Sequence, residues 1–346
     1  MPDMAAKLKF LQTPASYGRA GVQLECIETH MSWIFLLEQQ VFKLKKPVRF
    51  PFLDFTTLQA REFYCREEVR LNARLAPGVY LGVVALQWCD GTFSLVPETH
   101  LSVPGETVDW LVLMRRLPLP RMLNQLIVSQ QVAPPDMAAL VAVLAAFYRA
   151  APVAPVGARD YLARFSCELA LNREVLLRPQ FQLRDAALAI DRLEMALALS
   201  ADALCARVLQ HRVLDGHGDL RPDHICLLEP PVVIDCLEFN PQLRQLDPFD
   251  EMAYLGLECE MAGAPWIGPY LASGLARAMG NSPPAALLQL YTANRALLRA
   301  RLAMAHLLDP QPRQPDKWPL LAERYIARAL VACEAVTASV RRGWPG

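Results

Sequence analysis

The sequence changes character once, near Arg121, and that change limits what the chain can fold into. Before it, short apolar runs rich in aromatic and β-branched residues alternate with turn signals, as at 32–37, 38–40 and 41–46. After it, long stretches rich in Ala and Leu at 135–151, 184–209 and 287–308 predict helices. We therefore predict an α+β chain, β-rich at first and mostly helical later.

The N-terminal part reads as a sheet with one long helix. Strands are predicted at 22–28, 32–37, 41–46, 80–88, 93–96 and 109–117, with a short helix at 4–12. Thr56 or Thr57 is suited to cap a helix that runs to about Leu75, because a threonine hydroxyl accepts hydrogen bonds from the first free amides.

One polar segment, at 211–239, interrupts the helical part. Six potential charges or ligands lie within the twelve residues 214–225, and Asp235 follows sixteen residues after Asp219 at the end of an apolar strand. Two carboxylates on adjacent strands of a hairpin repel each other unless a cation or a proton offsets the repulsion. Mg²⁺ prefers such oxygen ligands together with substrate phosphates, so this segment is the candidate for chemistry.

The order Asp219, His224, Asp235 matches a kinase catalytic loop, in which a base is followed five residues later by a metal-binding residue. The form HGDL resembles the loop of the aminoglycoside phosphotransferase and choline kinase superfamily, whose usual motif is H-G-D-x-x-x-x-N. The stretch LDPFDEMAYL from Leu246 is similar to the next element of that superfamily, an Asp followed by a helix. By this resemblance Asp250 would brace the catalytic loop from behind.

The stretches at 28–55 and 63–84 resemble an uncharacterised bacterial branch of the same superfamily, and the likeness covers most of residues 20–260. The resemblance implies a bilobal protein-kinase-like fold, with an N-lobe at 1–117 and a C-lobe at 118–346 that holds the catalytic loop at 214–239. Some relatives carry a second, P-loop kinase domain. The chain contains no G-x-x-x-x-G-K-[ST], so we expect it to lack that domain.

Roles in the C-lobe follow from the resemblance, and each has a plain structural alternative. Asp219 would orient or deprotonate the acceptor hydroxyl, and Arg221 would contact the transferred phosphoryl group or be a structural arginine. Asp235 would bind Mg²⁺. His224 stands where the superfamily has Asn, so it would bind metal or brace the loop, since imidazole is a softer ligand. His217 is expected to shape the loop.

In the N-lobe, the resemblance requires a strand lysine paired with a helix carboxylate. Lys43 and Lys45 share one strand face; we choose Lys43 and leave Lys45 open. Glu68 is chosen over Glu67, because Leu71 and Leu75 fall on its side of the helix. Two further residues are expected to contact the nucleotide. Ser32 lies in the loop that would cover the phosphates, which lacks G-x-G-x-x-G, and Met114 begins the hinge 114–117.

We therefore expect an ATP- and Mg²⁺-dependent phosphotransferase acting on a hydroxyl of a small molecule that the sequence does not identify. The missing glycine loop and His224 favour an alternative, a pseudokinase-like protein that binds nucleotide or a partner. A protein kinase is the third candidate; the HGD loop and the lack of an A-P-E segment favour a small acceptor instead.

Composition narrows the partners and the compartment. Lys+Arg and Asp+Glu are both 35, and this neutrality argues against a broad nucleic-acid-binding surface. The nine scattered cysteines form no C-x-x-C pair, which indicates thiols in a reducing compartment. The N-terminus lacks the pattern of a signal peptide and the longest apolar run is too short to span a bilayer. We expect a cytoplasmic protein without membrane contact, of undetermined oligomeric state.

Overall fold

The computed structural model describes residues 2–18, 23–101, 105–309 and 311–341. Contacts divide the chain into two compact units. Unit 1 comprises Met1–Leu126 and Asp223–Leu243, and unit 2 comprises Ile127–Pro222 and Arg244–Gly346. The mixed α+β, protein-kinase-like fold class predicted from the sequence is confirmed. The predicted lobe boundary after residue 117 stays a prediction. The two units are divided differently from the predicted lobes, because residues 223–243 pack with unit 1.

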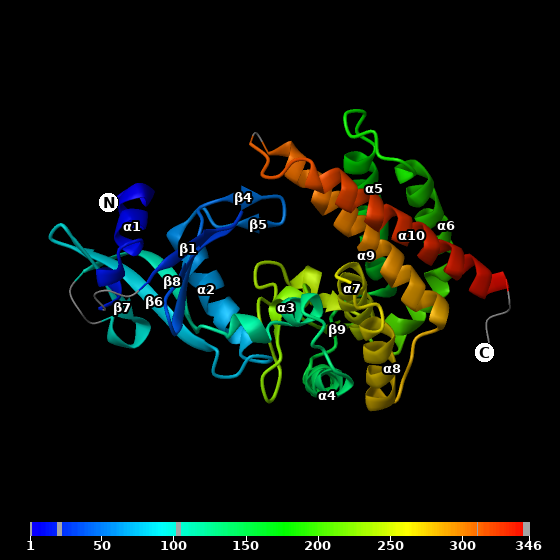
Figure 1. The fold of residues 1–346 in the computed structure, drawn as a ribbon, viewed down its shortest axis with the longest axis horizontal. Helices are drawn as coiled ribbons and strands as arrows, with labels where there is room; N and C mark the ends of the chain where they lie inside the picture. Colours follow the sequence, from blue (N-terminus) through cyan, green and yellow to red (C-terminus); the bar gives the residue numbers. More distant parts are fainter. Residues whose placement is uncertain (1, 19–22, 102–104, 310, 342–346) are drawn as a thin grey trace. The chain divides into compact units, whose positions relative to one another are not determined.

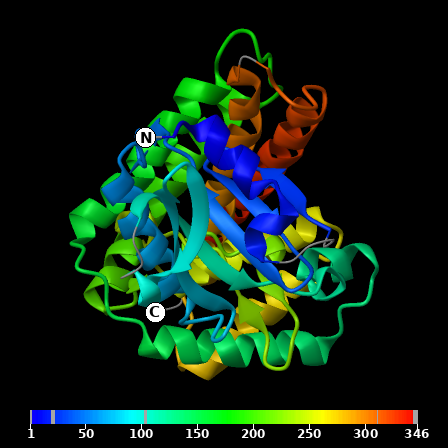
Figure 2. The same ribbon diagram turned by 90° about the vertical axis from the view of Figure 1, so that its left-hand side faces the viewer.

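Unit 1 is built on a six-stranded sheet with the order β1-β2-β3-β8-β6-β7, all neighbours antiparallel. Its strands are β1 (Glu25–Glu28), β2 (Ser32–Leu36), β3 (Gln40–Lys45), β6 (Tyr80–Cys89), β7 (Thr92–Pro97) and β8 (Glu106–Arg115). The predicted hairpin is the pair β2–β3, with Ile34 opposite Lys43. Figure 2 shows the twisted strands in blue and cyan.

Helix α2 (Leu58–Asn72) packs against β6 and β8, as Figure 1 shows. The Thr57 hydroxyl caps it by accepting a hydrogen bond from the Ala60 amide at 3.1 Å. On the helix, Cys65 and Leu71 are fully buried, which fixes the face that α2 turns to the core. A buried ion pair joins α2 to the sheet, where Arg61 donates twice to Asp109, at 2.7 and 3.0 Å.

The remaining elements of unit 1 are short. They are α1 (Met4–Leu11), η1 (Pro14–Tyr17), β4 (Arg49–Phe50), β5 (Leu53–Asp54), η2 (Glu98–His100), η3 (Leu119–Arg121), η4 (Pro222–His224, reaching into this unit from unit 2), β10 (Ile225–Cys226), β11 (Val232–Val233) and η5 (Pro241–Arg244, continuing into unit 2); α3 (Leu123–Val128) begins here. The predicted hairpin of the polar segment is thus reduced to two residues per strand, β10 with β11. Neither Asp219 nor Asp235 lies in those strands, so the picture of two carboxylates on paired strands was wrong.

Unit 2 is helical. Its helices are α4 (Pro134–Ala150), α5 (Ala158–Leu176), α6 (Ala186–Leu209), α7 (Pro248–Met261), α8 (Ile267–Met279), α9 (Ala285–Ala305), η6 (His306–Leu308) and α10 (Lys317–Arg341), with a two-residue pair of β9 (Leu214–Asp215) and β12 (Gln245–Leu246). Helices α9 and α10 run side by side, in orange and red in Figure 1. Helices α4, α6, α7 and α9 were predicted; α5, α8 and α10 were not singled out. None of the helices in the described residues is long and apolar enough to cross a membrane.

Candidate active site

Five charged side chains of unit 1 form one network. Lys43 Nζ lies 2.8 Å from both a Glu68 oxygen and an Asp235 oxygen. Lys45 Nζ lies 2.6 Å from the other Glu68 oxygen and pairs with Glu238 as well. Glu68 therefore holds both lysines, and each lysine reaches a second carboxylate in the segment that follows β11. We call this set the lysine–carboxylate cluster.

The two lysines differ in exposure. The side chain of Lys43 is 14% exposed and that of Lys45 only 1%. Lys45 is enclosed further by the Phe55 ring, whose centroid lies 5.0 Å from Nζ. Lys43 is thus the more accessible of the two lysines, whereas Lys45 is part of the buried framework.

Burial and ion pairing oppose each other in this cluster. Burial alone would lower the pKa of Lys43, but the Asp235 and Glu68 carboxylates outweigh it and raise that pKa well above its ordinary value. Burial would likewise raise the pKa of Glu68, yet the two lysines hold it below the ordinary range. For Glu238 burial wins over the attraction of Lys45, and its pKa is raised. The cluster counts three carboxylates against two lysines, so it favours added positive charge.

The backbone at Asp235 is held in a conformation that is uncommon for a residue with a side chain. Its φ is +64°, in the left-handed region. The Asp235 amide donates to the Tyr80 hydroxyl at 3.1 Å, and the next amide, of Cys236, donates to Asn72 Oδ1 at 2.9 Å. These two bonds from β6 and α2 fix the turn that presents the Asp235 carboxylate. Strain held in place in this way is typical of functional positions.

His224 and Asp235 are the candidate metal ligands. His224 Nε2 lies 3.5 Å from Asp235 Oδ2, and the Asp235 side chain is 44% exposed. Among the described residues no group of three or more His, Cys, Asp or Glu side chains could hold a metal ion. The Asp235 carboxylate fits an ion that takes its other ligands from phosphate and water, as Mg²⁺ commonly does, whereas the His224 imidazole is a softer ligand than Mg²⁺ prefers. They do not form an all-protein cage.

Two other predicted nucleotide contacts are strand residues. Ser32 is the first residue of β2, is buried, and closes a turn in which its amide donates to Thr29 Oγ1 at 3.0 Å. Met114 lies within β8 and pairs with Val41 on one side and Tyr80 on the other. The amides of the next two residues, Arg115 and Arg116, donate to backbone carbonyls at 2.8 Å. The nucleotide roles of Ser32 and Met114 stay predictions.

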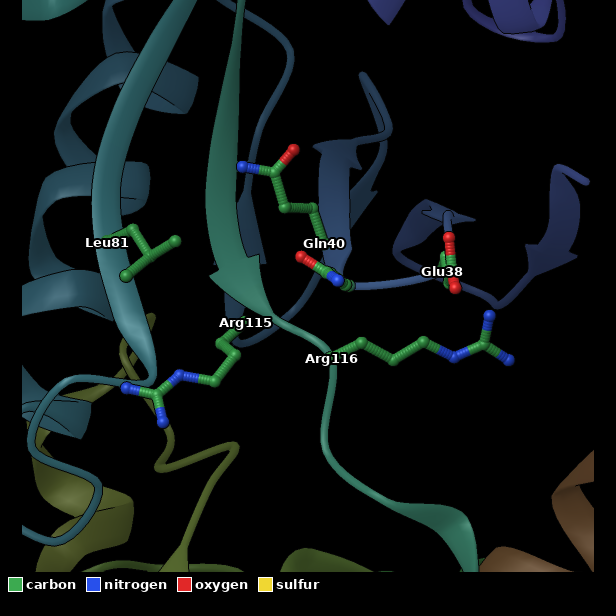
Figure 3. A pocket seen from close by; sticks show the side chains of 6 residues that line it. Glu38, Gln40, Leu81, Arg115 and Arg116 are labelled. Atoms are coloured by element: carbon green, nitrogen blue, oxygen red, sulfur yellow. The ribbon is translucent and has the colours of Figure 1, made fainter. Parts of the chain in front are cut away.

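A surface hollow of about 420 Å³ lies at the end of β8, lined by Glu38, Gln39, Gln40, Leu81, Arg115 and Arg116. Figure 3 shows the two arginine side chains running in opposite directions from the strand. Arg115 Nη2 donates to the Gly78 carbonyl at 2.6 Å, and Arg116 Nη1 to the Leu37 carbonyl at 2.9 Å. The hollow shares Arg115 and Arg116 with the predicted hinge 114–117, and it is lined by none of the other predicted site residues.

The loop around Asp219 belongs to unit 2, and α7 holds its backbone. The amides of His217 and Gly218 donate to Glu251 Oε1 at 3.0 and 2.5 Å. Gly216 leaves no room for a side chain, because a Cβ there would lie 2.8 Å from Glu251 Oε2. The ring of His217 is fully buried, and its Nδ1 accepts from the Asp219 amide at 3.3 Å. His217 therefore shapes the loop.

The side chains of Arg221 and Tyr254 contact the Asp219 carboxylate. Arg221 Nε lies 3.0 Å from Oδ1 in an ion pair, and the Tyr254 hydroxyl donates to the same oxygen at 3.2 Å. Arg221 thus lies beside the predicted base.

Asp250 does not contact the loop as predicted. Its two oxygens accept from Arg295 at 2.7 and 2.8 Å, while the neighbouring Glu251 holds the loop. Successive helix positions point about 100° apart, so an error of one residue changes the partner completely. Burial raises the pKa of Glu251, even though Tyr148 donates to it at 2.6 Å.

The other acidic residues of α7 are also paired. Glu258 accepts from Arg299 at 3.0 Å and from Tyr325 at 2.7 Å. Glu260 accepts from Arg328 at 2.9 Å. These carboxylates therefore take part in contacts between helices.

Sequence reasoning missed three contacts of the site. Glu238 follows Asp235 by three residues in an irregular segment, where no periodic pattern marks a buried side chain. Tyr254 and Glu251 lie on a helix of which eleven of fourteen residues are buried, so neither stands out from the core. The one available signal was the i, i+3 spacing of Glu251 and Tyr254, which puts both on one face.

Comparison with solved structures shows that the chain shares its fold with several proteins named as kinases or phosphotransferases. A choline/ethanolamine kinase family protein from Mesorhizobium loti matches with a TM-score of 0.55 at 16% identity, over 98% of this chain and 99% of that one. Choline kinase from Cryptosporidium parvum matches with 0.53 at 9% identity, over 97% and 96%. A GDP complex of a variant aminoglycoside 2'-phosphotransferase-IIIa matches with 0.51 at 14% identity, over 97% and 98%. The chain has the fold these proteins share, as the sequence resemblance implied.

No protein-family model matches the chain. Uncharacterized proteins of Mycobacterium tuberculosis and Mycobacterium bovis are 30% identical over 302 residues, which is 82% of this chain and 55% of theirs. The chain therefore spans about half the length of the curated relatives it matches.

Proposed function

We propose that the protein is a phosphotransferase that moves the γ-phosphoryl group of ATP to a hydroxyl of a small molecule. The lysine–carboxylate cluster carries this proposal. In it the more accessible lysine, Lys43, pairs with Glu68, which is the ion pair that a kinase-type nucleotide site requires. The same lysine also contacts Asp235, the proposed Mg²⁺ ligand. The kinase fold of the matched structures supports it further.

In this proposal Lys43 pairs with the nucleotide phosphates, Glu68 orients it, and Asp235 with His224 holds Mg²⁺. The bound ion would neutralise charge on the β- and γ-phosphates. Asp219 accepts the proton of the acceptor hydroxyl, and Arg221 stabilises the phosphoryl group. Most of the rate gain comes from positioning and electrostatics, since phosphoryl transfer needs little covalent chemistry from the protein.

The acceptor belongs to a class other than polycationic drugs, because the carboxylates of α7 are committed to arginines, tyrosine and loop amides. A reducing, cytoplasmic setting is part of the proposal, and all nine cysteines are free thiols. The rival, a binding protein without turnover, is favoured by His224 and by the loop without glycines.

A screen of hydroxyl-bearing metabolites for ATP consumption tests the proposal, with Asp219→Asn as the control. We expect Asp219→Asn to lower turnover by about 10²–10⁴-fold while ATP binding, measured by calorimetry, is retained. Equal turnover in the two proteins would contradict the role of Asp219. ATP binding without turnover by any acceptor would favour the rival.

A further inference from the structure

Tyr254 lies against the predicted base but has no role in the phosphotransferase chemistry described above. It is 3% exposed and its hydroxyl donates to Asp219 Oδ1 at 3.2 Å. It stands three residues after Glu251 on α7, so one helix face holds both the backbone and the side chain of the loop.

The tyrosine is itself held from α9. The guanidinium of Arg295 lies over its ring, 4.9 Å from the centroid, and the same guanidinium is fixed by two hydrogen bonds to Asp250. The order of contacts is Asp250, Arg295, Tyr254, Asp219. Asp250 is thus linked to the loop through two intervening side chains, Arg295 and Tyr254.

Five charged groups face this tyrosine. They are Asp219 and Arg221 from the loop, Arg295 and Arg299 from α9, and Glu258 from α7 itself. Helix α8 approaches α7 through backbone, at Gly268 against Gly256. Burial, and next the Asp219 carboxylate, raise the pKa of the Tyr254 hydroxyl far above its ordinary value. The hydroxyl therefore keeps its proton and can always donate.

We infer that Tyr254 is a positioning residue, which holds the Asp219 carboxylate in one orientation and stabilises its ionised form for proton acceptance. A hydrogen bond to a carboxylate favours the charged state over the protonated one. Ion pairing with Arg221 acts on the same oxygen. This inference rests on the proposed role of Asp219 as base.

The test is Tyr254→Phe, which removes the hydroxyl and keeps the ring. We expect kcat for ATP consumption to fall about tenfold, with the KM for ATP unchanged. The acidic limb of the pH–rate profile should move to higher pH by roughly half to one unit. An unchanged kcat together with an unmoved acidic limb would overturn the inference.

Tyr291→Phe is the matched control. Tyr291 is fully buried and its hydroxyl donates to Asp247 at 3.1 Å, the same kind of bond away from the loop. Both variants should lose similar thermal stability, and only Tyr254→Phe should move the acidic limb. A similar shift of the acidic limb in both variants would show that Tyr254 has only a structural role.

A measurement without turnover separates this inference from the proposed function. With ¹³C-labelled aspartate carboxyls, Asp219→Asn identifies the Asp219 signal by its disappearance. Tyr254→Phe should move the titration of that signal to higher pH, and an unmoved titration would contradict the inference even if the enzyme is active. If Asp219→Asn consumes ATP as fast as the wild type, the proposed function fails, whatever the titration shows.

Discussion

The lysine–carboxylate cluster and the Asp219 loop are stabilised in different ways. In the cluster, the side chains proposed to act stabilise one another, since Lys43 depends on Glu68 and Asp235 for its charge partners. In the loop, side chains of a buried helix hold both the backbone and the carboxylate. The ion pairs of the cluster can rearrange when charge is added to them, as phosphate, metal or protons would do. A loop anchored by α7 keeps its geometry.

The largest expected effect is at Glu68, which holds both lysines at once. Glu68→Gln leaves two buried ammonium groups with fewer partners, so we expect the free energy of unfolding to fall by about 3–5 kcal/mol. Glu67→Gln is the control, because Glu67 pairs with Arg70 at the surface, and a change within about 0.5 kcal/mol is expected. Urea denaturation followed by circular dichroism measures both. Equal losses would show that the cluster is not what stabilises this region.

Lowering the pH should also remove the contribution of Glu68 to the free energy of unfolding. The folded-state pKa of Glu68 is lowered from the ordinary value of 4.5, so its contribution is complete above that value and is lost as pH falls through the lowered one. The difference in unfolding free energy between the wild type and Glu68→Gln should therefore be largest at neutral pH and shrink below about pH 4.5. A difference that grows on acidification would contradict the ion-pair account.

The second-largest expected effect distinguishes the roles of Lys43 and Lys45. Lys43→Met should lower turnover by about 10²–10³-fold, because it removes the reachable cation. Lys45→Met should lower stability more than Lys43→Met does, since Lys45 is 1% exposed and its loss takes a lysine partner from two buried carboxylates, Glu68 and Glu238. Steady-state kinetics and thermal denaturation of both variants decide this. A greater loss of turnover in folded Lys45→Met would reverse the assignment.

The smallest effect is at Glu251. Glu251→Gln weakens the acceptor of the loop amides, and we expect a loss of about 1–2 kcal/mol in unfolding free energy. Glu260→Gln, on the exposed end of the same helix, should change it by less than about 0.5 kcal/mol. If Glu251→Gln has the same free energy of unfolding as the wild type, then α7 does not anchor the Asp219 loop as described.

Local patterns were enough to predict much of unit 1. The hairpin that carries Lys43 followed from alternation and a polar turn, and the choice of Glu68 followed from the spacing of Leu71 and Leu75. Both leucines are buried, although α2 ends at Asn72, so that Leu75 lies beyond the helix that was predicted to reach it. These features depend on residues close in sequence, where strand and helix periods fix which face each side chain takes.

Contacts between distant segments could not be predicted from local patterns. The switch from Asp250 to Glu251 depends on the exact rotation of α7, which is set by its packing against α8 and α9. The pairing of Lys45 with Glu238 joins β3 to an irregular segment 193 residues away. Local patterns in the sequence indicated the segments that form the candidate site, but not which neighbouring side chain makes each contact.

The central claim is that Asp219 serves transfer of the γ-phosphoryl group to a hydroxyl. Phosphorus NMR of ATP and Mg²⁺, incubated with the protein and the acceptor found by the metabolite screen, follows that group directly. We predict a new phosphate monoester signal that grows as the γ-phosphate signal falls, and that is absent with Asp219→Asn. Release of inorganic phosphate alone, or an equal monoester signal with Asp219→Asn, would contradict it.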